Sequence, residues 1–403
     1  MPTNQFDASA SLLGYLYQCR QALLLTIGKA RIDPGIQVIV EKFDDVTFGD
    51  ESGDIKERVQ TKYHIGLTRS LSDRSPDLWK TIRIWAEGII AGEIDPTETL
   101  LSLVTTANAP SGSVAQMLRL YGRDEERALT LLTSIAASSP SAENAPGFAV
   151  FKQLSFAQKR ALISAIYVHD ASASMHDAYE ELQAQVVFAV ERKYSGALLE
   201  RLEGWWLKKV IRQLMSPQIQ PILGQEVEAQ ILAIADQFRM DNLTIDFVLS
   251  EPPQGADPES DTRTFVHQLR LIALSSPRIA DAILDYYRAF QQRSKWLRED
   301  QLLIPELEQY ENRLIDEWRR KSNQIKEELP ADPADDSVLQ KAGRDLYNWM
   351  HDNADIPIRA RCREPYVLRG TYHLLADTPP DAPRVGWHPD FAKRLQRLLA
   401  APE

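Results

Sequence analysis

The stretch from Ile36 to His64 constrains the fold more than any other part of the chain. Residues 36–48 and 55–64 are rich in β-branched and aromatic side chains, whereas residues 49–53 are mostly Gly, Asp and Ser. This pattern predicts two antiparallel strands joined by a tight turn. A helix is predicted before the hairpin, over residues 9–27, and a second one begins after it at Ser75-Pro76-Asp77.

Residues further along the chain extend this core. A third strand is predicted over residues 100–105, and the short apolar run at 162–168 is another strand candidate. Residues 124–233 and those beyond Ser276-Pro277 have mainly helical patterns. We therefore predict an α/β domain with a helical extension over residues 1–224, followed by a mainly α-helical domain over residues 225–403.

The composition limits the compartment. Cys19 and Cys362 are the two cysteines, and neither has a metal-type or redox-type partner nearby in the sequence, which is typical of a reducing compartment. No segment reaches the roughly 18 uncharged apolar residues of a membrane helix. Residues 1–10 contain Asp7 and no basic residue, unlike a signal peptide. We expect a cytoplasmic protein that does not bind a membrane.

The charge distribution argues against a protein that coats nucleic acid. The net charge is -11, with 23 basic and 26 acidic residues in residues 1–224 and 23 and 31 in residues 225–403. The C-terminal part is therefore the less suited to hold phosphate. An enzyme that gathers carboxylates around a divalent cation can still bind DNA through a local basic rim.

The residues with chemical potential gather on the predicted hairpin. In an extended strand Glu41 and Asp45 share one face, and on the returning strand Gln60, Lys62 and His64 share a face. Pairing through the 49–53 turn would bring Asp45 near Gln60 and Lys62. Mg²⁺ (or Mn²⁺) prefers such oxygen ligands, and a bound cation activates water for phosphodiester hydrolysis. We predict Asp45, Glu41 and Gln60 as metal ligands and Lys62 as the residue that stabilises charge on the phosphate.

Alternatives remain for several of these residues. Strand alternation favours Asp45 over Asp44 as the ligand, with Asp44 left at the strand end. Glu41 is equally well explained as a solvated strand residue. His64 is a candidate DNA contact, although a rim histidine without a catalytic task is the simpler interpretation. Two basic residues of the helix after Pro76 are further candidates for contacts with DNA phosphate or belong to a solvated face, namely Lys80 and Arg83.

An acid followed by Gln60-Thr61-Lys62 resembles the PD-(D/E)xK restriction-endonuclease-like superfamily, in the variant whose last motif reads QxK. The resemblance implies a central mixed sheet flanked by helices. It also implies that Asp45 binds the metal, that Gln60 replaces the second acid and that Lys62 is the catalytic lysine. The superfamily often has an acid on the preceding helix, where this chain offers Gln18.

Longer segments resemble bacterial CD-NTase-associated double-strand DNA endonucleases and the effector subunits of ABC three-component systems. They comprise residues 8–18, 41–46, 60–64 and 75–83 for the nuclease domain, and 286–290, 317–318, 369–377 and 386–391 for the C-terminal domain. The resemblance implies an Mg²⁺-dependent endonuclease of double-stranded DNA in antiphage defence. The implied partners are an ABC-type ATPase and a small middle component, and nucleases that cut both strands commonly act as homodimers.

Two other functions are compatible with the same residues. The uncharged Gln60 and the missing helix acid are also expected of a nuclease fold that has decayed into an adaptor for the ATPase. The motif does not distinguish DNA from RNA, because the cation acts on the phosphodiester group common to both. Near the C-terminus a set of polar residues is expected to lie in a structural loop and not to bind metal, namely His373, Asp377, His388 and Asp390.

Overall fold

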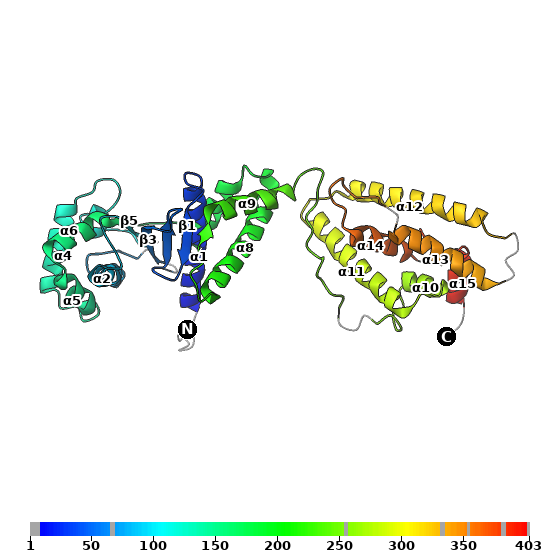
Figure 1. The fold of residues 1–403 in the computed structure, drawn as a ribbon, viewed down its shortest axis with the longest axis horizontal. Coiled ribbons are helices and arrows are strands. Elements are labelled where there is room, and N and C mark those ends of the chain that lie inside the picture. The colour runs from blue at the N-terminus through cyan, green and yellow to red at the C-terminus, as the bar shows by residue number, and fades with distance from the viewer. Residues whose placement is uncertain are drawn as a thin grey trace. The chain divides into compact units, whose positions relative to one another are not determined.

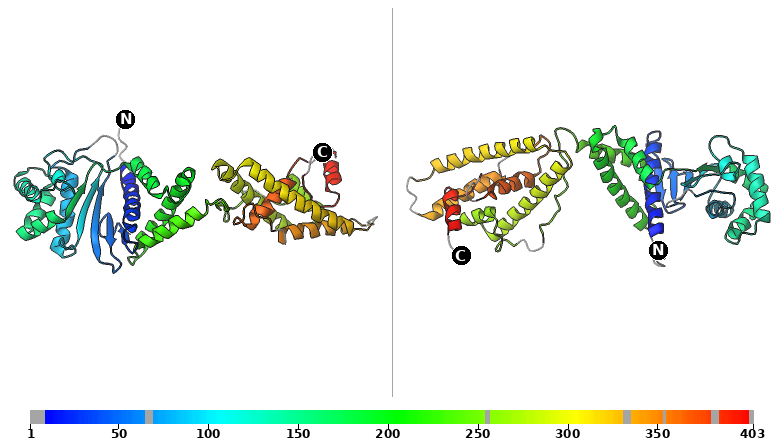
Figure 2. Two further views of the ribbon diagram at one scale, coloured as in Figure 1. Left: turned by 90° about the horizontal axis from the view of Figure 1, so that it is seen from above. Right: turned by 180° about the vertical axis from the view of Figure 1, so that it is seen from behind.

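The structure, a computed structural model, describes residues 9–64, 69–253, 257–330, 335–352, 355–379 and 384–400. Contacts divide the chain into two compact units, Met1–Ala235 and Asp236–Glu403 (Figures 1 and 2). The sequence suggested a boundary at residue 224, where helix α9 (Gly224–Asp236) begins. This helix belongs with the first unit, because the backbone N–H of Gly224 donates to the Ile36 carbonyl at 2.8 Å.

A six-stranded mixed sheet forms the centre of the first unit. In the order β5-β4-β3-β2-β1-β6, the central strands β1, β2 and β3 pair antiparallel, β3, β4 and β5 pair parallel, and β6 pairs antiparallel with β1. The predicted α/β class is confirmed. The strands are β1 (Gln37–Val40), β2 (Val46–Gly49), β3 (Ile55–Lys62), β4 (Leu100–Thr105), β5 (Ile166–His169) and β6 (Ile222–Leu223).

The prediction of one continuous strand over residues 36–48 is wrong. Strand β1 ends at Val40 and β2 begins at Val46, and these two residues pair across a hairpin. Residues 41–45 form the turn, in which Glu41 adopts a left-handed φ of 56° and its N–H donates to the Asp45 carbonyl at 3.0 Å. The polar run of this segment favours a turn over a strand. The alternation argument that paired Glu41 with Asp45 therefore does not apply.

The remaining strand predictions agree more closely with the structure. The turn at 49–53 joins β2 to β3, and β4 covers the predicted residues 100–105. The apolar run at 162–168 is divided instead, because helix α6 continues to Ala165 and β5 begins at Ile166. A short apolar run at a helix–strand junction has no periodicity that separates the two states.

Helices cover both faces of this sheet. Figure 1 shows α2, α4, α5 and α6 on one side and α1, α8 and α9 on the other. Helix α2 begins after the N-cap Ser75 with Pro76 as predicted, and it buries Leu78, Ile82 and Trp85. Besides α9, the helices of this unit are α1 (Ser9–Ala30), α2 (Pro76–Ala91), α3 (Val114–Met117), α4 (Glu125–Ser138), α5 (Ala145–Gln153), α6 (Phe156–Ala165), α7 (Met175–Val186), the short 3-10 helix η1 (Arg192–Tyr194) and α8 (Ser195–Met215).

The second unit is helical, as predicted. Its helices are α10 (Thr264–Leu271), α11 (Ser276–Arg298), α12 (Ile304–Glu327), α13 (Asp336–Asp352), α14 (Pro365–Ala376) and α15 (Phe391–Ala400). Aromatic side chains fill its core, and buried Trp296 donates its indole N–H to the Thr244 carbonyl at 2.7 Å. The expectation that His373 lies in a loop is wrong, because this residue is within α14. In the described parts of the chain, no helix is long and apolar enough to span a membrane.

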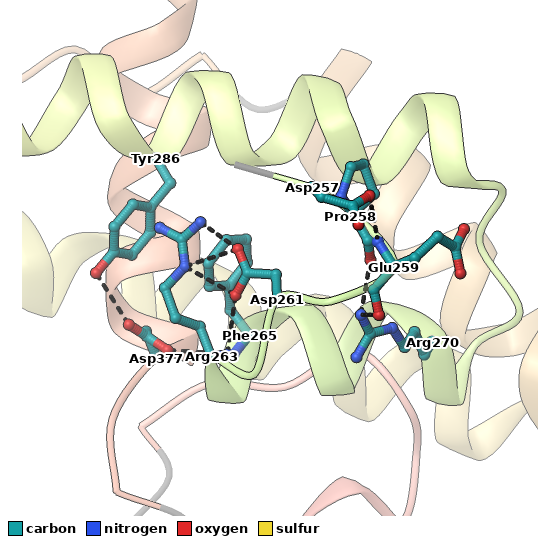
Figure 3. Close-up of polar contacts among 9 residues, drawn as sticks. All are labelled: Asp257, Pro258, Glu259, Asp261, Arg263, Phe265, Arg270, Tyr286 and Asp377. Carbon is teal, nitrogen blue, oxygen red and sulfur yellow. Dashed lines mark hydrogen bonds and ion pairs between the residues drawn. The ribbon is translucent and has the colours of Figure 1, made fainter. Parts of the chain in front are cut away.

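An arginine fixes the segment that leads into α10 (Figure 3). The Arg263 guanidinium lies 5.0 Å from the ring centroid of Phe265 and 4.6 Å from that of Tyr286, and it is paired with Asp261. The Tyr286 hydroxyl donates to Asp377 at 2.9 Å. The two rings stack at 4.8 Å. This cluster joins the segment before α10 to α11 and to the end of α14.

Two histidines lie side by side in the second unit, His373 buried and His351 partly buried. The ring of His351 stacks on Tyr347 at 4.1 Å, and its centroid lies 5.4 Å from that of His373. Burial, followed by the charges of Arg369 and Arg278, lowers the pKa of His351 to about 3. Burial also lowers the pKa of His373 well below its usual value. Both rings are therefore neutral in the folded protein at neutral pH.

Acidification from pH 7 to pH 5 is expected to destabilise the second unit. The unfolded chain binds protons on His351 near pH 6.5, whereas the folded chain does so only near pH 3. The stability due to the neutral ring is complete above about pH 6.5 and is lost as the pH falls towards about 3, by at most about 1.4 kcal/mol per pH unit. Hydrogen exchange of α13 and α14 across this range measures the loss.

His351→Phe keeps a stacked ring at this position without a titrating group, so its stability should depend less steeply on pH. The control is His176→Phe, because the His176 side chain is 79% exposed in α7. This variant should retain the slope of the unaltered protein. An unchanged slope in His351→Phe would contradict the assignment.

Candidate functional site

The candidate site lies where the β1–β2 turn meets the end of β3. The turn carries Glu41, Asp44 and Asp45, and β3 contributes Gln60 and Lys62. Helix α1 reaches the same place from one face of the sheet, because the rings of Tyr17 and Tyr63 stack at 4.6 Å. Helix α2 approaches with its buried Trp85.

Asp45, Gln60 and Lys62 form a connected set of side chains. The Gln60 amide Nε2 donates to Asp45 Oδ1 at 3.2 Å, and Lys62 Nζ donates to Gln60 Oε1 at 2.9 Å. The other oxygen of Asp45, Oδ2, accepts from the Thr61 N–H at 2.7 Å and from Thr61 Oγ1 at 3.0 Å. The structure thus brings together the acid, the amide and the lysine of the predicted site.

Asp44 occupies a different environment from Asp45. Its side chain is buried, accepts the indole N–H of Trp85 at 2.9 Å through Oδ2 and accepts a hydrogen bond from Gln60 through Oδ1. Burial is the main reason that the pKa of Asp44 rises to about 7, and the charge of Asp45 adds to it. Asp44 is therefore enclosed by protein donors, whereas Asp45 is only partly buried.

Glu41 stands at the other end of the turn and is exposed. Its pKa is raised by partial burial and by the charge of Asp45, and it is lowered by the charge of Lys62. A non-glycine residue in a left-handed conformation costs roughly 1–2 kcal/mol. Glu41 adopts this conformation next to two charged groups of the site, Asp45 and Lys62. Its carboxylate is therefore counted with the candidate site.

The three candidate DNA contacts all have acidic neighbours. His64 Nε2 lies 2.9 Å from Asp77 Oδ2 at the start of α2. Two residues of α2 form weaker pairs, exposed Lys80 with Glu143 at 4.0 Å and partly buried Arg83 with Glu87 at 3.6 Å. These surface pairs are worth little in water, so the basic groups can exchange them for phosphate.

The sequence interpretation missed the contributions of Trp85 and Thr61. Trp85 is not among the predicted site residues, yet its N–H reaches into the site. A buried indole needs an acceptor for this N–H, but no local pattern identifies Asp44 as that acceptor. Thr61 is the middle residue of the QxK motif, in which roles were predicted for Gln60 and Lys62 alone.

The donor set fits a hard divalent cation. Asp45 and Glu41 supply carboxylates, and Gln60 supplies an amide oxygen whose second lone pair is available after Lys62 has donated to the first. Mg²⁺ typically takes one or two carboxylates and keeps several waters. Burial and, after it, the charge of Asp45 raise the pKa of Glu41, and a cation held between these carboxylates would favour their ionised forms. In the described part of the chain no group of three or more His, Cys, Asp and Glu side chains is arranged to hold a metal.

Comparison with known proteins gives little for the whole chain. No curated protein matches the sequence. Among solved structures, the Moraxella osloensis Cap4 SAVED/CARF-domain containing receptor is similar over 70% of this chain and 68% of that chain, with 14% identity and a TM-score of 0.36.

The second unit gives a more specific match. Residues 265–395 match the model of C-terminal domain 7 of the ABC-three component (ABC-3C) systems. The matched region begins at Phe265, directly after the segment that Arg263 fixes, and extends into α15. Over these residues the second unit is therefore similar to a C-terminal domain of ABC-3C systems.

Proposed function

We propose that this protein is the nuclease effector of its ABC-3C system, a metal-dependent endonuclease that hydrolyses double-stranded DNA when its partners trigger it. The observation that carries the proposal is the connected set of Asp45, Gln60 and Lys62 beside Glu41. The central mixed sheet flanked by helices supports it, because the PD-(D/E)xK resemblance implies that architecture. The six-stranded sheet positions the acid on a turn and the lysine at a strand end.

Each residue of the set has a separate task in this proposal. Asp45, Glu41 and Gln60 would hold Mg²⁺ or Mn²⁺, which when bound polarises the phosphate and lowers the pKa of a coordinated water. Lys62 keeps its ammonium group at the edge of the set, where it can donate to phosphoryl oxygens as negative charge develops. Thr61 holds Asp45 in place through two hydrogen bonds. His64, Lys80 and Arg83 are the proposed contacts with DNA phosphates.

The second unit is the proposed docking domain for the partners. Its match to an ABC-3C C-terminal domain supports binding to an ABC-type ATPase and a small middle component. The acidic surplus of residues 225–403 makes this part less suited to DNA. A division of tasks follows, in which the first unit cuts and the second unit receives the signal.

Asp45→Asn is expected to weaken Mn²⁺ binding at least about tenfold and to abolish cleavage, because one of the two carboxylates loses its charge. Isothermal titration of the full chain with Mn²⁺ measures the first effect. Nicking of plasmid DNA by the protein with its ATPase and middle component measures the second. The control is Asp50→Asn, at the other end of β2, where Asp50 accepts the Ser52 N–H at 2.9 Å within the β2–β3 turn. It should bind Mn²⁺ like the unaltered protein.

The same measurements separate the alternatives. A protein that binds no Mn²⁺ at millimolar concentration and cuts nothing with its partners would be an adaptor, which the uncharged Gln60 also allows. Cleavage of duplex RNA in preference to DNA would move the proposal to an RNA-directed nuclease. Either result would overturn the DNA endonuclease.

A further inference from the structure

We propose that Asp44 is a positioning residue, which Trp85 holds in place and which fixes the Gln60 amide so that its carbonyl oxygen faces Lys62 and the cation. This inference rests on the proposed function and deepens it. It also separates the two adjacent aspartates. Asp45 faces the cation, whereas Asp44 acts through Gln60.

The hydrogen bonds converge on the carboxylate of Asp44 from both sides. Trp85 has only a donor, its indole N–H, and this group donates to Asp44 Oδ2 at 2.9 Å. Asp44 Oδ1 then accepts from the Asp45 backbone N–H at 3.2 Å and from the Gln60 amide nitrogen. Lys62 donates to the far end of Gln60, at Oε1. Three of the residues are buried, with exposed fractions of 1% for Trp85, 8% for Asp44 and 4% for Gln60.

An amide side chain on its own does not specify which end faces a ligand. Rotation of Gln60 by half a turn about its last bond exchanges the oxygen and the nitrogen with little change in shape. In the exchanged orientation two N–H groups would face the Lys62 ammonium and a cation, which is repulsive. Both oxygens of Asp44 meet donors, and Asp45 Oδ1 accepts a further hydrogen bond from the same Gln60 nitrogen at 3.2 Å, so the nitrogen end is held and the oxygen end is left toward Lys62.

An exchange of the acid and the amide tests this arrangement. In Asp44→Asn the Trp85 N–H occupies the oxygen of the new amide, so the new NH₂ group meets the Gln60 NH₂ group and the Gln60 amide turns over. In Gln60→Glu three carboxylates meet. In the double variant the amide introduced at position 44 donates its NH₂ group to the carboxylate introduced at position 60, while Trp85 and Lys62 keep their acceptors. The Asp45 N–H and Asp45 Oδ1 lose the partners that they have in the unaltered chain.

The four proteins are compared by melting temperature without metal and by isothermal titration with Mn²⁺. Each single variant is expected to melt about 2–4 °C lower than the unaltered chain and to bind Mn²⁺ about tenfold more weakly. The double variant should recover part of the lost melting temperature and should bind Mn²⁺ more tightly than either single variant. If Asp44 had only a structural task, Asp44→Asn would lower the melting temperature and leave Mn²⁺ binding unchanged.

The outcomes distinguish this inference from the proposed function. Additive losses in melting temperature, or an Mn²⁺ affinity unchanged in Asp44→Asn, would overturn the positioning task. Recovery of melting temperature in a chain that never binds Mn²⁺ would support the fixed orientation of Gln60 and overturn the nuclease. The control is Gln268→Glu in the second unit, where the buried amide donates to the Ala376 carbonyl at 2.9 Å. It should lower the melting temperature and leave Mn²⁺ binding unchanged.

Discussion

Lys62→Ala is expected to reduce DNA cleavage by about a hundredfold or more while the protein remains folded and binds Mn²⁺. Removal of one donor that stabilises charge in a transition state typically costs this much. Stability should change little, because Lys62 is only partly buried and, among the residues that the structure describes, its ammonium donates to Gln60 Oε1. Single-turnover cleavage at saturating Mn²⁺, with the partner components present, measures the rate.

Lys56→Ala is the matched control for this variant. Lys56 lies on the same strand β3, an even number of residues from Lys62, and pairs with Asp50 at 3.2 Å. It has the same side-chain chemistry at the opposite end of the strand, so cleavage should be unaffected. If Lys62→Ala cleaves DNA as fast as Lys56→Ala, the assignment of the catalytic lysine is wrong.

Gly370→Ala is expected to destabilise the second unit by about 3 kcal/mol or more. A Cβ atom at Gly370 would lie 2.1 Å from the backbone oxygen of Asp285 and 2.5 Å from the Cβ of Ala289. Both contacts are on α11, whose backbone approaches α14 at this point, so the helices would have to separate. This cost exceeds the gain of about 1 kcal/mol that alanine gives in a helix. Hydrogen exchange of α11 and α14 measures the effect.

Gly204→Ala tests the same substitution without the close approach. Gly204 lies within α8 of the first unit, and a Cβ atom there would meet nothing within 4 Å. The variant should be as stable as the unaltered protein or more stable by up to about 1 kcal/mol. A tolerated alanine at Gly370, with α11 and α14 protected as before, would show that these helices can move apart at little cost.

The main elements of both units could be predicted from local patterns. Strand β4 and the start of α2 follow from an apolar run and from Ser75-Pro76, which act over a few residues. The hairpin between β1 and β2 could not be recognised by the same means, because Ile36–Val40 and Val46–Phe48 look like one strand when the acids between them are read as solvated positions. The division at Ala165 was ambiguous for a similar reason.

Only part of the candidate site could be predicted from local sequence patterns. The proximity of Gln60 to Asp45 and Lys62 was predicted from pairing through the 49–53 turn, although the alternation argument for Glu41 was wrong. The different environments of Asp44 and Asp45 depend on Trp85, which lies 41 residues further along the chain in α2. A contact of that kind requires the packing of α2 on the sheet, and no pattern within the hairpin contains it.

The closed turn between β1 and β2 also affects how related sites can be recognised in other sequences. Its first and last residues, Glu41 and Asp45, are tied by one backbone hydrogen bond, so the separation of their carboxylates depends on the length of this loop. Insertion or loss of one residue there would move an acid away from the proposed cation site while both strands kept their pairing. A search motif for proposed sites of this kind should therefore hold the spacing between these two acids constant and let the β2–β3 connection vary in length.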